Sequence, residues 1–391
     1  MLIQKKRILN SMPRKLGTVI FFFALANCTM SCSAPNKKAL PKEPEAKPSA
    51  NKIVENMKFG WNLGNTLDAT AGGEPSNGWA GANKSLGIRT ETNWGKPLTT
   101  QAMIKGLKAS GISTIRLPIS WHDHIDSSYK IDPAWMNRVK TIVDWAMEEG
   151  LYVIINIHHD NVAADKLGEN SGKGFCPAPN CMAESKRYLS NIWEQVAATF
   201  NNDYDEHLIF EVMNEPRLPG DPHEWNWEPS CKTCNESMDC INEYNQLCVD
   251  TIRASGGNNA TRMLMIPSYV AAPGAAISPK FKMPKDPANC LALSVHMYTP
   301  YDFAMKDKDC VAVFVFHCKI IRRVHVHRKR KAVCLVFRHF EFRAYCCTGR
   351  GNIRRNHQHA CGIVSATGAD CVYTKLVIFI DAVHRLVASL A

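Results

Sequence analysis

The chain has 391 residues, 45% of them hydrophobic, which is enough for one large buried core or two modest ones. Its net charge of +11 belongs entirely to residues 310–391, which carry 14 lysines and arginines against three acidic residues, so residues 1–309 are neutral. The charge therefore gives no reason to expect a nucleic-acid partner for the main part of the chain.

Residues 1–32 have the pattern of an export signal. Basic residues up to Lys15 precede an apolar run at 16–26, which is too short to span a bilayer as a stable helix. Cys28 and Cys32 each stand in an imperfect lipoprotein cleavage context, so simple secretion and lipid anchoring both remain open. We expect a secreted or cell-surface protein, in the lipid-anchored case a periplasmic or outer-membrane lipoprotein, with membrane attachment only through an N-terminal lipid.

Residues 33–52 are rich in Pro, Lys, Ala and Glu and predict a solvated linker. Residues 53–305 then alternate short apolar runs with amphipathic stretches. We expect strands near 58–63, 114–119, 152–157, 208–213, 262–266 and 291–295, and helices near 99–110, 133–149, 183–200 and 238–255. This alternation predicts an α/β fold with a parallel sheet, and no glycine-rich phosphate loop opens a helix. A (β/α)8 TIM barrel is therefore favoured over a dinucleotide-binding sheet.

Polar residues lie in or directly after four of the predicted strands. They are Arg116 in the second, His158 and His159 after the third, Asn214 and Glu215 after the fourth, and His296 and Tyr298 after the sixth. Each one alone has a structural interpretation, since a histidine at a strand end is more often hydrogen-bonded than catalytic. The carboxyl ends of all strands meet on one face of a TIM barrel, where active sites are built. The four strand ends together therefore predict one pocket.

These residue types suit the hydrolysis of a glycosidic bond. A carboxylic acid must protonate the leaving oxygen, and a second carboxylate must attack carbon or activate water. Glu215 would be the acid, with a pKa raised by its pocket, and Asn214 would hydrogen-bond the sugar 2-hydroxyl. Arg116 and Tyr298 would hold the second carboxylate ionised and oriented. The three histidines would bind sugar hydroxyls or tune Glu215.

Five motifs occur in order: 61–68 (WNLGNTLD), 116–118 (RLP), 156–160 (NIHHD), 214–216 (NEP) and 296–300 (HMYTP). Together they closely resemble glycoside hydrolase family 5, in particular its bacterial endo-β-1,4-glucanase branch, subfamily 4, over residues 53–305. The resemblance implies a (β/α)8 barrel, a retaining double-displacement mechanism, cellulose or related β-glucans as substrates, and no metal. It places the acid/base at Glu215 and the supporting residues at Arg116, His158, Asn214, His296 and Tyr298.

Four further residues are expected to bind substrate: His159, which also matches this branch, Trp61, Asn65 and Trp94. A tryptophan offers a flat apolar face on which a pyranose ring can stack, although core packing is an equally good interpretation of any one tryptophan.

Long loops at 160–182 and 217–237 are expected to line the groove. In an exported protein their cysteines more often form loop-stapling disulfides than metal sites. Cys231 and Cys234 have the spacing of half a zinc site, but no second ligand pair follows, so we expect no metal here.

The family pattern breaks after Met305. The family's nucleophile is a second glutamate in a Gly-Glu-Phe/Tyr-Gly setting, whereas Glu341, the one glutamate after Met305, has other neighbours and is not assigned. Residues 310–391 contain no Pro, Trp or Met, yet hold seven of the 14 His and seven of the 16 Cys. For 306–391 we favour a frame-shifted or disordered tail over a basic nucleic-acid-binding appendage or a metal site.

The sequence thus predicts an incomplete barrel with about six recognisable βα units, the last two replaced by the atypical tail. Six strands alone would leave two open sheet edges. We expect a monomeric endo-β-1,4-glucanase that binds β-glucan and no nucleic acid, needs no cofactor and, lacking its nucleophile, has little or no activity. A xyloglucanase or mannanase of the same family and a non-catalytic glucan-binding protein are the alternatives.

Overall fold

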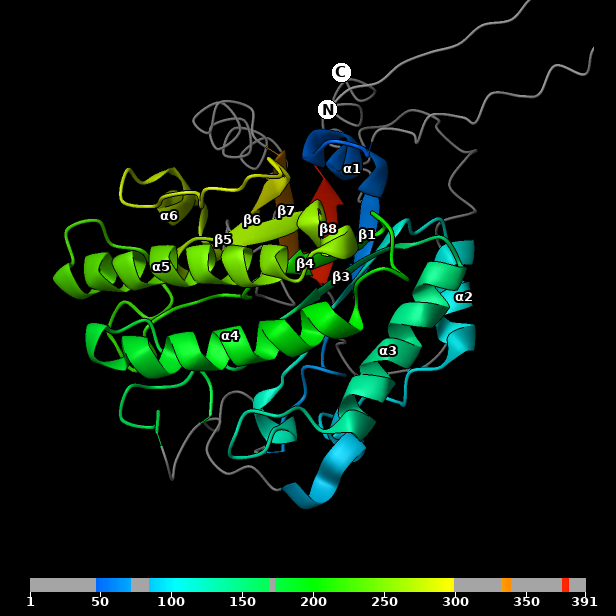
Figure 1. The fold of residues 1–391 in the computed structure, drawn as a ribbon, viewed down its shortest axis with the longest axis horizontal. Coiled ribbons are helices and arrows are strands. Elements are labelled where there is room, and N and C mark those ends of the chain that lie inside the picture. The colour runs from blue at the N-terminus through cyan, green and yellow to red at the C-terminus, as the bar shows by residue number, and fades with distance from the viewer. Residues whose placement is uncertain (1–46, 72–83, 169–172, 299–331, 339–374, 380–391) are drawn as a thin grey trace, which may run out of the picture. The chain divides into compact units, whose positions relative to one another are not determined.

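A computed structural model describes residues 47–71, 84–168 and 173–298, and the backbone of residues 332–338 and 375–379 (Figure 1). The predicted export signal with Cys28 and Cys32, and the unassigned Glu341, lie outside the described residues. So does the predicted tail, apart from the two short strands.

Six parallel strands form the main sheet, each paired with the next along the chain. They are β1 (Phe59–Asn62), β2 (Thr114–Leu117), β3 (Tyr152–Asn156), β4 (Leu208–Glu211), β5 (Leu264–Pro267) and β6 (Leu291–Met297). Every residue of β2 to β5 is buried, as expected for a sheet covered on both faces. The six predicted strands and the barrel class are confirmed.

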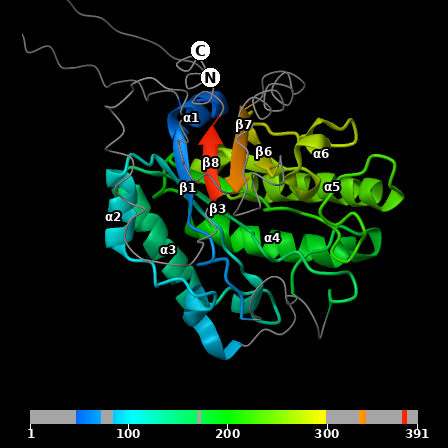
Figure 2. The same cartoon turned by 180° about the vertical axis from the view of Figure 1, so that it is seen from behind.

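Two further strands close the ring in the order β1 to β8. Strand β7 (Ala332–Arg338) runs parallel to β6, whereas β8 (Lys375–Phe379) is antiparallel to both β7 and β1. Figure 2 shows β8 between β1 and β7. The parallel order of β1 to β6 therefore continues to β7 and is broken at β8. The open edges that we expected are occupied by backbone pairing instead, because β8 pairs on both sides.

The helices of the outer layer are α2 (Gln101–Ala109), α3 (Pro133–Glu148), α4 (Met182–Thr199), α5 (Lys232–Ala254) and the short α6 (Pro273–Ile277). Helix α3 shows why these segments fold as predicted. Asp132 caps it and Pro133 occupies its first turn. Its buried residues recur at helical spacing, from Trp135 and Val139 to Ile142.

Helix α5 begins six residues before the predicted start at residue 238. The reason is an unusual cap: Cys231 precedes the helix, and its side chain accepts the backbone N–H of Cys234. A thiol is not among the preferred capping groups, so the signal for a helix start at Cys231 is weak.

Helix α1 (Ala50–Met57) is capped by Ser49 and begins inside the predicted linker. Its apolar face packs in one cluster with interior residues from the amino-terminal part of the strands, among them Ile154, Ile209 and Ala292. This apolar layer fills the part of the barrel that lies below the polar site.

The cysteines of the described segments are all free thiols: Cys176, Cys181, Cys231, Cys234, Cys240, Cys248 and Cys290. The expected loop-stapling disulfides are therefore wrong for this part of the chain. No helix in the described ranges is long and apolar enough to cross a membrane.

Candidate active site

Strand alternation brings the polar residues into the barrel interior. Side chains two positions apart face the same side of a strand. Ile209 belongs to the apolar layer around α1, and Glu211 follows on the same face. In β3, Ile154 is followed in the same way by Asn156, which pairs in register with Glu211. A polar layer therefore lies directly above the apolar one, toward the carboxyl ends of the strands.

Arg116 and Glu211 form the centre of this layer, and both are fully buried. The Arg116 guanidinium donates to Glu211 Oε2 through Nε at 2.9 Å and again through Nη2. It also donates to Asn62 Oδ1 and Asn214 Oδ1, each at 2.8 Å. We had expected Arg116 to hold the second carboxylate of the reaction, but its carboxylate partner among the described residues is Glu211, which the sequence analysis left without a role.

The remaining contacts of Glu211 keep it ionised. Asn156 Nδ2 donates to Oε2 at 2.8 Å, and Ser294 Oγ donates to Oε1 at 2.7 Å. Burial by itself would raise the pKa of Glu211, but the Arg116 charge and hydrogen bonds from His296 and Ser294 outweigh it and lower that pKa to about 2. Glu211 is thus an enclosed anion that fixes Arg116, not a group that can approach a substrate.

Glu215 stands at the edge of the same network. Its Oε1 lies 2.5 Å from His296 Nδ1 and accepts the Tyr298 hydroxyl at 2.8 Å. The other ring nitrogen of His296 is 3.5 Å from Glu211 Oε1, so this histidine lies between the two glutamates. We had assigned Tyr298 to the second carboxylate, but the carboxylate that it contacts here is Glu215.

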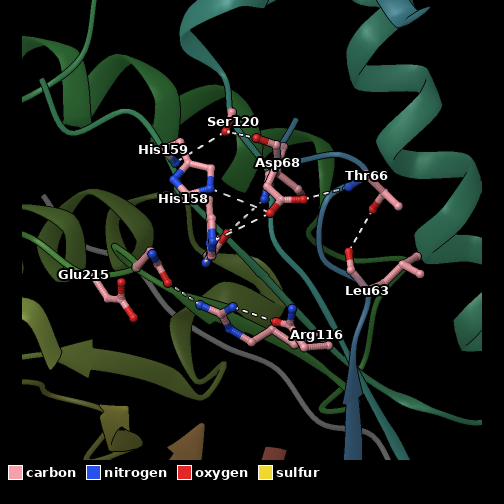
Figure 3. A network of polar contacts seen from close by, with 12 residues as sticks. Leu63, Thr66, Asp68, Arg116, Ser120, His158, His159 and Glu215 are labelled. Atoms are coloured by element: carbon pink, nitrogen blue, oxygen red, sulfur yellow. Dashed lines mark hydrogen bonds and ion pairs between the residues drawn. The ribbon is translucent and has the colours of Figure 1, made fainter. Parts of the chain in front are cut away.

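His158 and His159 approach a buried carboxylate that the sequence analysis also missed, Asp68 (Figure 3). Asp68 Oδ2 lies 3.9 Å from His158 Nε2 and 3.8 Å from His159 Nε2. Its other oxygen accepts the backbone N–H of Thr66 at 2.8 Å. Asp68 is the last residue of the WNLGNTLD motif, and that position is the signal in the sequence that could have identified it.

These three residues are close enough together to hold a metal ion, so their protonation has to be considered. Asn156 has a fixed amide orientation, because its Oδ1 accepts the Ile119 N–H and its Nδ2 donates to Glu211. The same Nδ2 therefore donates to His158 Nδ1, at 3.0 Å. A neutral His158 then carries its proton on Nε2, the atom that a metal would need as a ligand. In this tautomer the cluster fits a set of ion-pair contacts better than a metal site.

The geometry agrees with the comparisons with known proteins. The family profile "Cellulase (glycosyl hydrolase family 5)" matches residues 71–325, about two thirds of the chain. This chain belongs to glycosyl hydrolase family 5. The match runs past residue 305, where we had placed the end of the family-like sequence, and stops at residue 325.

Known members of family 5 resemble the chain closely. Endoglucanase A of Clostridium longisporum is 38% identical over 294 residues, which cover 75% of this chain and 52% of that protein. A subfamily 4 broad-specificity endoglucanase from Ruminococcus champanellensis, solved with bound cellotriose, is 38% identical with a TM-score of 0.62 over 73% of this chain and 79% of that one. PbGH5A from Prevotella bryantii B14, solved with a xyloglucan tetradecasaccharide, is 34% identical with a TM-score of 0.61 over 73% of this chain and 77% of that one. The chain spans about half the length of the first curated relatives.

The expected substrate-binding residues of this family 5 chain separate into two groups. Trp94 is buried, and its ring centroid lies 5.5 Å from that of His159, so these two side chains lie against each other. Trp61 is partly buried and packs against the hydrophobic core. Asn65 is half-buried in the loop after β1, with a left-handed backbone at φ 60° that asparagine tolerates well.

The loop after β4 contributes residues that sequence reasoning did not assign. Arg217 donates to the Glu215 backbone oxygen at 3.2 Å and to Glu224 at 3.0 Å. Its guanidinium carbon lies 3.8 Å from the ring centroid of Trp225, which is 62% exposed. This loop therefore presents an exposed tryptophan that Arg217 links to the strand end carrying Glu215.

Proposed function

We propose that this protein acts on β-glucans as an endo-β-1,4-glucanase of family 5, with Glu215 as the proton donor. The observation that carries the proposal is the contact of Glu215 with His296 and Tyr298, at the carboxyl end of the barrel strands. A protonated Glu215 would carry the acidic proton on its carboxyl group. That proton would pass to the glycosidic oxygen as the bond to the anomeric carbon breaks.

Asn214 would orient the sugar in this reaction. Its Oδ1 accepts from Arg116, so the Nδ2 group is the part of the amide that can act as a donor to the sugar 2-hydroxyl. Hydrogen bonds to this hydroxyl strengthen in the transition state. Glu211 would support catalysis indirectly, because it holds the guanidinium that fixes Asn214.

We propose further that this chain binds β-glucan with little or no turnover. A retaining mechanism needs a second carboxylate about 5 Å from the acid that can attack carbon. Glu211 does not meet this need, because its oxygens are taken up by Arg116, Asn156 and Ser294. In the described part of the barrel, Glu215 is therefore an acid without a matching nucleophile.

Xyloglucan is the second candidate substrate, supported by the likeness to PbGH5A in its complex with a xyloglucan oligosaccharide. The test uses the full chain in affinity electrophoresis with carboxymethylcellulose, xyloglucan and mannan, together with a reducing-end assay on each. Retardation by carboxymethylcellulose without release of reducing ends is the expected result. Robust hydrolysis would refute the proposal that the chain lacks a nucleophile. Failure to bind any of these polymers would refute the proposal that it acts on β-glucans.

A further inference from the structure

Two cysteines and an aspartate come together where the loop after β4 enters α5. Cys231 is the N-cap of α5, and its Sγ accepts the backbone N–H of Cys234 at 3.3 Å. Asp221, from the middle of the same loop, places a carboxylate oxygen within 4.8 Å of both sulfur atoms. The sequence pattern contained only the cysteine pair, and the fold adds the third group.

We propose that Asp221, Cys231 and Cys234 bind one divalent cation of the borderline or soft class, such as Zn²⁺. Two sulfurs and one oxygen suit Zn²⁺ or Cd²⁺, whereas Mg²⁺ and Ca²⁺ prefer shells made of oxygen alone. Tetrahedral coordination with Zn–S bonds of about 2.3 Å separates two sulfurs by roughly 3.8 Å. That separation lies inside the 4.8 Å within which all three donor atoms are found.

The donor atoms are held in place before any ion arrives. The backbone N–H of His223 donates to Asp221 Oδ1 at 2.8 Å, which fixes the rotation of the carboxylate. Cys231 Sγ receives the N–H of Cys234 and lies 3.2 Å from Thr233 Oγ1.

The position of the site also allows an ion to reach it. Cys234 is 1% exposed, whereas Asp221 and Cys231 are half-buried and form the side that faces solvent. Three protein ligands leave a fourth tetrahedral position for a water molecule. The site is therefore a partly open one at the surface of the helix layer.

Binding of the ion would connect the middle of the loop after β4 to the end at which it enters α5. The segment from Glu215 to Cys231 carries Arg217, which donates to the Glu215 backbone and stacks on Trp225. A cation shared by Asp221 and the first turn of α5 would cross-link the middle of this loop to a rigid helix. The inference does not depend on the proposed function, because it concerns only the order of the loop and its metal content.

The test uses the full chain, reduced with a phosphine, stripped with a chelator and titrated with Co²⁺. Tetrahedral Co²⁺ bound to thiolates has strong visible d–d bands and an ultraviolet charge-transfer band, and Zn²⁺ should displace it.

The chain has sixteen cysteines, so the result is read as a difference between variants. We expect Cys234→Ser to bind one equivalent fewer than the parent chain and Asp221→Asn to bind at least about tenfold more weakly. Cys181→Ser, a buried cysteine outside the cluster, should bind as the parent chain does.

A second measurement needs no variant and covers the case in which Cys234→Ser does not fold. Zn²⁺ should slow the alkylation of Cys231 by iodoacetamide at least about tenfold. Mass spectrometry of the peptide that contains Cys231 measures this rate. The proposal is overturned if Zn²⁺ gives no protection, if Cys234→Ser binds as many equivalents of Co²⁺ as the parent, or if Asp221→Asn binds Co²⁺ as tightly as the parent. It is also overturned if the pair is isolated as a Cys231–Cys234 disulfide that takes up no metal after reduction.

Discussion

Two glutamates four positions apart on the same chain segment have opposite environments. Glu211 lies inside β4, is fully buried, and accepts hydrogen bonds from Arg116, Asn156 and Ser294. Glu215 lies past the strand end, is slightly exposed, and is bonded through one oxygen to His296 and Tyr298. The same side chain is a structural anion at one position and a candidate acid at the other, because the number and charge of its partners differ.

The largest expected effect comes from removing the partner of the enclosed glutamate. Arg116→Ala leaves Glu211 as an uncompensated buried charge, so the free energy of unfolding should fall by about 3–5 kcal/mol. Urea unfolding followed by tryptophan fluorescence measures this. Arg187→Ala removes an exposed ion pair with Glu184 and should cost less than about 1 kcal/mol. Equal losses in the two variants would show that Glu211 is not held as described.

The second prediction concerns how the stability contributed by Glu211 depends on pH. The pKa of Glu211 is about 2 in the folded chain, below the ordinary value of 4.5 that applies to the unfolded chain. A lowered folded pKa contributes stability that is fully present above about pH 4.5 and is lost as the pH falls toward 2. This contribution is on the order of 3 kcal/mol.

Urea unfolding at several pH values between 5 and about 2 provides the measurement. Glu211→Gln should be less stable than the parent at pH 5, and its stability should fall less steeply as acid is added. Parallel curves for the two proteins would contradict the pKa assignment.

The third prediction tests whether Glu215 acts as the acid, although the chain is proposed to lack a nucleophile. Formate is a small carboxylate that can take the place of an absent nucleophile, so it should restore slow cleavage of cellotetraose by this chain. Glu215→Gln should reduce the restored rate by about 10²-fold, because the leaving oxygen then receives no proton. Glu236→Gln, on the exposed face of α5, should leave it unchanged. If formate-restored cleavage proceeds equally well without Glu215, another group is the acid.

The sequence could predict the residues at strand ends but not their partners. His158, Glu215, His296 and Tyr298 follow apolar runs, so their common face follows from the barrel class alone. Glu211 sits within an apolar strand, and its role depends on Arg116, 95 positions away. No periodicity encodes such a pairing.

The same limit applies to two other features. Asp221 became a possible ligand only once the loop had folded onto α5, because its spacing from Cys231 matches no common metal motif. The antiparallel direction of β8 depends on pairing with β1 and β7 at the two ends of the described barrel. Local sequence contains no information about which strands those will be.

The smallest expected effect tests the open face next to Glu215. Trp225 is supported from one side by Arg217, and its exposed ring is free of core packing. A pyranose ring that stacks there would gain about 1 kcal/mol, so Trp225→Ala should weaken cellotetraose binding by five- to tenfold, with stability changed by less than about 0.5 kcal/mol. Isothermal titration calorimetry measures the affinity. Trp145, which an arginine also faces but which lies on α3, provides the matched control: Trp145→Ala should leave the affinity as it is. Because Arg217 also holds the Glu215 backbone, unchanged binding in Trp225→Ala would mean that this loop positions the acid without touching the sugar.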